Sequence, residues 1–382
     1  MKIKNLVLSG GSIKGISFLG SIKFFEEYNI MDNLESICGT SIGSLIGTLI
    51  CLNYTYSELK SIFMKLNFDN FQDIDSNNII NFFNEYGVDS GDNFLRIIEI
   101  LIKAKTNNSK ITFKELYEKT NIKLIVTATC VNSKKLVYYN YEDTPQECVA
   151  LSIRKSISIP FLFKPILEND NYYVDGALIN NFPIDFYDND IDNTLGIIIS
   201  EDESNKVDIN SFDIFLLTLI ECSFKDSINK IISKYKKNII IINTNIHFLN
   251  FFISNNQKED LISLGYKSTI DYFDNYFIEI FDYGNLVSDK IINKSISQTE
   301  CSLKGYKLYN VNNNPIIISS KIDTVIGRKY FLHKKYLKEQ KTKTKNNIKY
   351  LLKKKDKIFI YEPIIDNIEI EETSLLKDGK WK

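Results

Sequence analysis

The stretch Cys38-Gly39-Thr40-Ser41-Ile42-Gly43 decides the fold, because it joins an extended apolar segment to a helix through a turn of small residues. Residues 34–38 have the character of a strand, and apolar residues recur at helical spacing over residues 45–50. A serine between two glycines in this setting is typical of a nucleophile elbow, where the sharp turn lifts the hydroxyl above the sheet edge. The helix that follows favours negative charge at its first turn. The alternative interpretation is a glycine-rich packing turn.

The same strand, loop and helix pattern stands at the start of the chain. An apolar run over residues 5–9 leads into Gly10-Gly11-Ser12-Ile13-Lys14-Gly15, and a helical pattern continues to Tyr28. Two such units favour a parallel sheet with helical crossovers. The loop can aim several backbone N–H groups at one anion. A dinucleotide loop would have glycine at Ser12, and a phosphate-binding Walker loop would have lysine at Ile16. The oxyanion of an acyl transfer, held by Gly10, Gly11 and Ser12, is therefore favoured over a nucleotide.

Further segments continue the alternation of strands and helices. Strands are predicted over residues 123–130, 136–139, 195–200 and 238–243, and helices over residues 89–105, 112–119, 145–156 and 258–281. Residues 163–168 and 172–174 are predicted to form a hairpin around an Asn-Asp-Asn turn. The fold class predicted from the residues is α/β, with a largely parallel central sheet.

A serine nucleophile needs a base, and the chain has only two histidines, His247 and His333. The first follows an apolar strand among aromatic residues, and the second lies in a basic segment, so neither is favoured as the base. An acid is the natural substitute. Asp175 follows the predicted strand at 172–174 and precedes Gly176, so a turn would present it at the sheet edge. A structural aspartate of a turn is the alternative.

These three segments, in this order, resemble the motifs of the patatin-like phospholipase family: Gly10 to Gly15, Gly39 to Gly43, and Asp175-Gly176-Ala177. The similarity extends to Ser156-Ile157-Ser158-Ile159-Pro160-Phe161 and to the residues after Ala177, and more weakly to residues 261–266. It therefore covers residues 3–280. The family's fold implies three layers, with a mostly parallel central sheet and helices on both faces.

The resemblance implies a catalytic dyad without histidine. Ser41 would be the nucleophile, Asp175 the proton acceptor, and the loop at Gly10, Gly11 and Ser12 the oxyanion hole. The motif-supporting positions would be Lys14, Gly15, Gly39, Gly43 and Gly176. The chain departs from the family pattern at Ser12, where a glycine is usual, and at Ser9, where an aspartate is common. Lys14 stands at the family's basic position, either as a catalytic group or as a solvent-facing or loop-bracing cation.

Composition excludes several other classes of protein. The 382 residues include 47 Lys and Arg and 48 Asp and Glu, giving a net charge of −1, and 44% are hydrophobic, which excludes a disordered polyelectrolyte. This balance also removes the simplest argument for nucleic-acid binding. Six cysteines without a Cys-x-x-Cys pair suggest neither a disulfide framework nor a zinc site, and no metal or cofactor is predicted. With no signal peptide or membrane-spanning run in view, a cytoplasmic or peripheral membrane location is predicted.

The sequence changes character after about residue 286. We predict a hydrolase domain over residues 3–280 and a C-terminal extension over residues 286–382, with a lysine-rich segment at 328–357. That segment is a solvated arm or a surface for anionic lipid, with no recognised nucleic-acid module to support a third option.

The leading interpretation is a lipid acyl hydrolase, an enzyme that cleaves fatty-acyl esters of phospholipids or other glycerolipids through an acyl-enzyme on Ser41. It would need no cofactor, and its partners would be the lipid substrate and, transiently, a membrane surface. The alternative is a catalytically inactive lipid-binding or scaffold protein with the same fold. Protein partners are not indicated.

Overall fold

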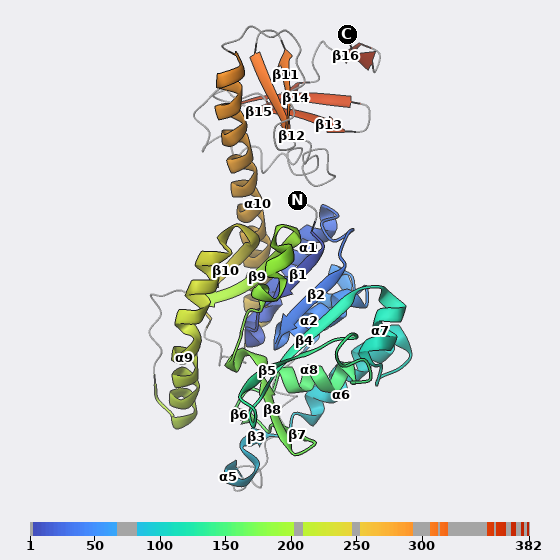
Figure 1. Ribbon diagram of the computed structural model, residues 1–382, viewed down its shortest axis with the longest axis vertical. Helices are drawn as coiled ribbons and strands as arrows, with labels where there is room; N and C mark the ends of the chain where they lie inside the picture. The colour runs from blue at the N-terminus through green and yellow to red at the C-terminus, as the bar shows by residue number, and fades with distance from the viewer. Residues whose placement is uncertain are drawn as a thin grey trace. The chain divides into compact units, whose positions relative to one another are not determined.

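The computed structural model describes residues 3–66, 82–201, 209–246 and 253–292, and seven strand segments beyond them: 306–311, 314–319, 350–354, 357–363, 368–371, 376–377 and 380–381 (Figure 1). The chain divides into two compact units. One comprises residues 2–26 and 31–272, and the other comprises residue 1, residues 27–30 and residues 273–382. The division at 280 and 286 that the sequence suggested stays a prediction.

The larger unit is built on an eight-stranded mixed sheet in the order β10-β9-β1-β2-β4-β8-β7, with β5 also paired to β4 (Figure 1). Five neighbouring strands are parallel: β10 (Ile239–Thr244), β9 (Thr194–Glu201), β1 (Asn5–Leu8), β2 (Ser36–Thr40) and β4 (Lys123–Cys130). The remaining strands are antiparallel to their neighbours: β5 (Lys135–Tyr139), β8 (Asn171–Asp175) and β7 (Ile166–Glu168). The predicted α/β class and mostly parallel sheet are confirmed.

Helices connect the strands. They are η1 (Ser12–Ser17), α1 (Phe18–Glu27), α2 (Ile42–Cys51), α3 (Tyr56–Lys65), α5 (Phe82–Glu85), α6 (Asp92–Thr106), α7 (Phe113–Thr120), α8 (Val149–Ser156), η3 (Gly176–Leu178), η4 (Ile184–Asn193), α9 (Phe212–Lys234), η5 (Lys236–Asn238) and α10 (Asn255–Ile292). A short parallel pair lies apart from the main sheet, between β3 (Gly87–Asp89) and β6 (Phe161–Phe163). The long helix predicted over residues 258–281 is confirmed within α10.

Helices cover both faces of the sheet, because successive side chains of each parallel strand point to opposite faces. Val7, Cys38 and Ile125 share a buried cluster with residues of η4 and with isoleucines of α9. Their neighbours along the strands, Leu8, Ile37 and Leu124, point the other way. Side-chain atoms of these three lie within 4.0 Å of the position that a Cβ on Gly47 of α2 would occupy. The predicted three layers are therefore confirmed.

The start of α8 differs from the prediction. A helix from residue 145 was expected, because proline is favoured in a first helical turn, but α8 begins at Val149. The backbone before it serves a different helix: the carbonyls of Pro145 and Glu147 accept N–H groups of Lys114 and Phe113, at the start of α7. The segment before α8 is therefore bonded to the start of α7 through its backbone carbonyls, and the helix begins only at Val149.

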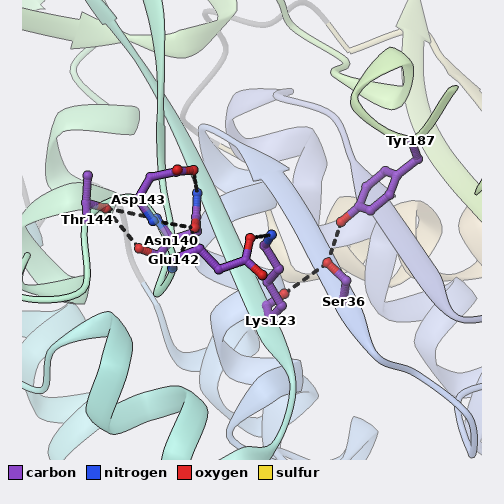
Figure 2. A network of polar contacts seen from close by, with 7 residues as sticks. All are labelled: Ser36, Lys123, Asn140, Glu142, Asp143, Thr144 and Tyr187. Carbon is purple, nitrogen blue, oxygen red and sulfur yellow. Dashed lines mark hydrogen bonds and ion pairs between the residues drawn. The ribbon is translucent and has the colours of Figure 1, made fainter. Parts of the chain in front are cut away.

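A polar network lies at the amino-terminal ends of β2 and β4 and links them to η4 and to the turn after β5 (Figure 2). The hydroxyl of Ser36 lies 2.5 Å from that of Tyr187 in η4 and donates to the carbonyl of Lys123, 3.2 Å away. The Lys123 ammonium pairs with Glu142, and the turn that carries Glu142 is held by the side chain of Asn140. This edge is therefore occupied by structural contacts, and the loops after the parallel strands lie at the opposite edge.

The smaller unit contains short antiparallel pairings among its described strands. β11 (Tyr306–Val311) pairs with β12 (Asn314–Ser319), β14 (Lys357–Pro363) lies between β13 (Tyr350–Lys354) and β15 (Ile368–Glu371), and β16 (Leu376–Lys377) pairs with β17 (Lys380–Trp381). Most of the lysine-rich segment at 328–357 lies outside the described residues. Among the helices that are described, none is long and apolar enough to cross a membrane.

Helix α2 packs directly on the end of β1, and this approach depends on Gly43 in its first turn. A Cβ at Gly43 would lie 2.4 Å from the carbonyl oxygen of Leu8 and 2.6 Å from that of Ser9. Backbone cannot give way as a flexible side chain can. Further along the helix, a Cβ at Gly47 would meet only side chains, the nearest atom being a methyl group of Ile37 at 2.9 Å.

We expect Gly43→Ala to destabilise the protein by roughly 1–3 kcal/mol, the usual cost of overpacking a close contact. Gly47→Ala is the matched control, because the same change in the same helix gains about 1 kcal/mol of helix propensity against a smaller clash. Urea unfolding midpoints of the two variants and the wild type measure the difference. A Gly43→Ala midpoint at or above that of Gly47→Ala would contradict the packing argument.

Candidate active site

Ser41 lies at the turn between β2 and α2, at the carboxyl-terminal edge of the sheet. Its backbone has φ 53° and ψ −127°, a conformation that a residue other than glycine rarely adopts, and the residue is 4% exposed. Such strain costs on the order of 1–3 kcal/mol and persists only where the surroundings impose it. The turn has the strand–serine–helix form that the sequence predicted for an elbow.

Asp175 ends β8 and caps the short helix η3. Its Oδ2 accepts the hydroxyl of Ser41 at 2.6 Å, although the two residues are 134 positions apart in the chain. Its Oδ1 accepts the N–H of Ala177 at 2.8 Å, so both carboxylate oxygens are hydrogen-bonded. The next residue, Gly176, lies over β4, where a Cβ would be 2.5 Å from the hydroxyl oxygen of Thr127. The structure thus brings together the two residues that the sequence singled out.

Burial raises the pKa of the Asp175 carboxyl to about 7. The hydrogen bonds from Ser41 and from the Ala177 N–H favour the charged form and lower the pKa, but they offset only part of the burial effect. No charged side chain among the described residues contributes to this shift. A carboxylate with a pKa near neutrality is a much better proton acceptor than an exposed aspartate.

The glycine-rich loop runs beside Ser41. A Cβ at Gly10 would lie 3.2 Å from that of Ser41. Gly10 donates its N–H to the carbonyl of Asn181 at 3.1 Å, whereas the N–H groups of Gly11 and Ser12 have no acceptor within the described part of the chain. The oxyanion role of all three residues stays a prediction. In this conformation the N–H groups that remain for an oxyanion are those of Gly11 and Ser12.

Lys14 and Gly15, the last two residues of the glycine-rich segment, lie in η1. Lys14 is buried, and its N–H donates to the carbonyl of Gly11 at 3.1 Å, so the solvent-facing alternative for this residue is wrong. A Cβ at Gly15 would lie 2.5 Å from the side chain of Ile42, the residue after Ser41. Lys14 thus bonds within the loop and Gly15 packs against the residue after Ser41, and the motif-supporting role of both stays a prediction.

Two structural contacts of the site had no role in the sequence interpretation. The side chain of Ser156 contacts the backbone of Ser41. The backbone of Ser158 contacts the backbone of Asp175. Their segment carried part of the family resemblance, but two serines before a proline do not indicate a contact. The two histidines, His247 and His333, lie outside the described residues. Within the described ranges, no three Asp, Glu, His or Cys side chains gather as a metal site requires.

Comparison with known proteins matches the same part of the chain. A family model described as patatin-like phospholipase covers residues 6–187. Uncharacterized protein R571 of Acanthamoeba polyphaga mimivirus is 30% identical over 278 residues, 70% of this chain and 92% of that protein. Probable lipid hydrolase 463L of Invertebrate iridescent virus 6 is 35% identical over 184 residues, 48% of this chain and 62% of that protein.

Among solved structures, VipD from Legionella pneumophila has a similar fold. The TM-score is 0.51 at 19% identity, over 72% of this chain and 67% of that one. This likeness concerns the fold alone. All the candidate residues, from Gly10 to Gly176, lie within the span that the family model covers.

The raised pKa of Asp175 predicts a dependence of stability on pH. An unfolded aspartate titrates near 3.9, and the folded carboxyl titrates at about 7, so between these values the folded state binds the additional proton. Stability therefore falls as pH rises through this window. Asp175→Asn keeps the size of the side chain and cannot ionise. We expect it to be more stable than the wild type at pH 8, by on the order of a few kcal/mol, and to lose most of that advantage at pH 5.

Thermal or urea unfolding of both proteins at the two pH values measures this difference. Equal stability at pH 8, or an advantage that grows as the pH falls, would show that the buried carboxylate is not the destabilising group.

Proposed function

Because the chain belongs to the patatin-like phospholipase family, we propose that it hydrolyses fatty-acyl esters of phospholipids or other glycerolipids, with Ser41 as nucleophile and Asp175 as its base. The observation that carries the proposal is the 2.6 Å hydrogen bond from the Ser41 hydroxyl to the Asp175 carboxylate. A relative named as a probable lipid hydrolase supports the substrate class. Residues 3–280 would form the hydrolase domain, and residues 286–382 its C-terminal extension.

The first half of the reaction forms an acyl-enzyme. The Oγ of Ser41 attacks the ester carbonyl carbon while its proton passes to Oδ2 of Asp175. The negative charge on the former carbonyl oxygen is stabilised by backbone N–H groups of the loop at Gly11 and Ser12. When the tetrahedral intermediate collapses, the carbon–oxygen bond to the glycerol breaks. The departing alkoxide takes the proton from Asp175, and the acyl group stays on Ser41.

The second half releases the fatty acid and restores the site. Water attacks the acyl carbon and gives a proton to Asp175, and the intermediate collapses with Ser41 as the leaving group. Ser41 then recovers its proton from Asp175. One carboxyl thus accepts and returns a proton in each half, which suits a group whose pKa is close to the working pH. The pKa of about 7 for Asp175 supports this role.

Loss of the hydroxyl or of the base tests the dyad. We expect Ser41→Ala to abolish labelling by a fluorophosphonate probe and to lower fatty-acid release from mixed phospholipid vesicles by about 10³-fold or more. Asp175→Asn should lower the rate of labelling and the rate of fatty-acid release by about 10³-fold, because the amide that replaces the carboxylate cannot accept the Ser41 proton. Labelling is measured by in-gel fluorescence, and release by mass spectrometry.

The matched control removes both histidines at once, as His247→Gln together with His333→Gln. It should keep activity within about twofold, because the proposed dyad needs no imidazole. Labelling that survives in Ser41→Ala would contradict the proposed nucleophile. Loss of activity in the folded histidine-free protein would contradict the proposed base. Folded wild type that neither labels nor releases fatty acid would favour the inactive scaffold.

The pH profile reports the base independently of any variant. Because only the ionised carboxylate accepts the Ser41 proton, kcat/KM should rise between pH 5 and 8, with its midpoint near the pKa of about 7. The rate of fluorophosphonate labelling should follow the same curve, since it uses the same nucleophile. A flat labelling profile across this range would show that Asp175 does not control the reactivity of Ser41.

A further inference from the structure

The last turn of α8 and the residues just after it form a run of buried polar side chains beside the Ser41–Asp175 pair. Arg154, Lys155, Ser156 and Ser158 are each no more than 1% exposed. Burying cations and hydroxyls is unfavourable unless they find partners. The contacts of this run therefore show which parts of the fold it holds in place.

Ser156 contacts the elbow. Its Oγ accepts the backbone N–H of Ser41 at 2.8 Å. Ser41 caps α2, and the N–H groups at the start of a helix have no partner within the helix. The hydroxyl of Ser156 supplies that partner, and it does so at the residue whose backbone has the positive φ of 53°.

Ser158, two residues further on, contacts the strand that carries the acid. Its carbonyl accepts the backbone N–H of Asp175 at 2.8 Å. Its hydroxyl donates to the carbonyl of Arg154 at 2.7 Å and accepts from the guanidinium of Arg154 at 2.5 Å. One short turn therefore holds the backbone of both members of the proposed dyad.

Arg154 and Lys155 hold the turn itself. The Arg154 guanidinium donates to the carbonyl of Ser90 at 2.7 Å and to that of Gly91 at 3.2 Å, in the segment before α6. The Lys155 ammonium lies 2.6 Å from a carboxylate oxygen of Glu168, at the end of β7 in the hairpin that leads to Asp175. The turn is thus bonded to the segment before α6 on one side and to the hairpin on the other.

From these contacts we propose that Ser156 is a positioning residue of the hydrolase reaction. By accepting the N–H of Ser41 it holds the backbone conformation that aims the Ser41 hydroxyl at Asp175, whose own backbone is held by Ser158 of the same turn. This inference rests on the proposed function of the Ser41–Asp175 pair. It assigns Ser156 no contact with substrate and no proton transfer.

The test compares two serines of the same helix. Ser156→Ala removes the acceptor for the Ser41 N–H. Ser152→Ala, one turn earlier, is the matched control, because Ser152 is equally buried and its hydroxyl has no partner among the described residues. We expect Ser156→Ala to lower kcat for fatty-acid release by about 10- to 100-fold with KM within about twofold, since a small displacement of a reacting group costs this much. Ser152→Ala should stay within about twofold of wild type in both constants.

Labelling with a fluorophosphonate distinguishes a misplaced Ser41 hydroxyl from a loss of folded protein. The final extent of labelling counts folded molecules that carry a competent Ser41, and the rate constant reports how well the hydroxyl is aimed. We expect Ser156→Ala to reach the same extent as wild type at a rate lower by a similar factor. A lower extent at an unchanged rate would mean that Ser156 only stabilises the fold, and would overturn the proposal. So would equal kcat for the two alanine variants, or a loss confined to KM.

The two proposals fail in different ways. If the proposed function is wrong, wild-type protein does not label at Ser41 and Ser41→Ala changes nothing. If only the positioning role is wrong, wild type labels, Ser41→Ala does not, and Ser156→Ala labels at the same rate as Ser152→Ala.

Discussion

The hydrogen bond between the Ser41 hydroxyl and the Asp175 carboxylate, 2.6 Å long, is the contact on which the rest of the site depends. A carboxylate that is almost fully removed from water is unfavourable, and two hydrogen bonds restore only part of the lost hydration. The remaining deficit is what raises the pKa of Asp175 to about 7. The same deficit makes the carboxylate a stronger base. The surrounding core therefore has to hold a group that weakens the fold when it is charged, which is a common relation between stability and activity.

Strand β4 brings the two residues together from distant parts of the chain. Thr40, just before the elbow, stands opposite Thr127 in the parallel ladder between β2 and β4. Asp175 stands opposite the next residue, Ala128, in the antiparallel ladder between β8 and β4. Because β4 pairs with both β2 and β8, it brings Ser41 and Asp175 to neighbouring positions along its length. A shift of one residue in a ladder turns the side chains of the shifted strand to the other face of the sheet. The proposed dyad therefore requires the observed register of β4 with both β2 and β8.

Local patterns in the sequence predicted much of this arrangement. The small residues of Gly39 to Gly43 between a strand and a helix indicate the elbow, and the strand that ends at Asp175 places an acid at an edge. The structure confirms the strand, turn and helix around Ser41, the strand that leads to Asp175, and the α/β class. Contacts made by backbone groups could not be predicted, because any residue offers the same N–H and carbonyl. The acceptance of the Ser41 N–H by Ser156, the use of the Gly10 N–H by Asn181 and the late start of α8 are all of this kind. Each depends on which distant segments the tertiary fold brings side by side.

The serine at position 12, where the family pattern has glycine, shows how this loop is specified. Ser12 has φ 52°, which costs a residue with a side chain on the order of 1 kcal/mol relative to glycine. The loop holds this conformation because its flanks are fixed: the Gly10 N–H is bonded to Asn181, and the Lys14 N–H is bonded to Gly11. Ser9, where an aspartate is common, accepts the N–H of Ile199 and donates to the carbonyl of Gly10, so it ties the loop to β9. The direction of a backbone N–H follows from φ and ψ and not from the side chain. Serine in the glycine conformation therefore changes the stability of the loop while leaving the proposed oxyanion donor in place.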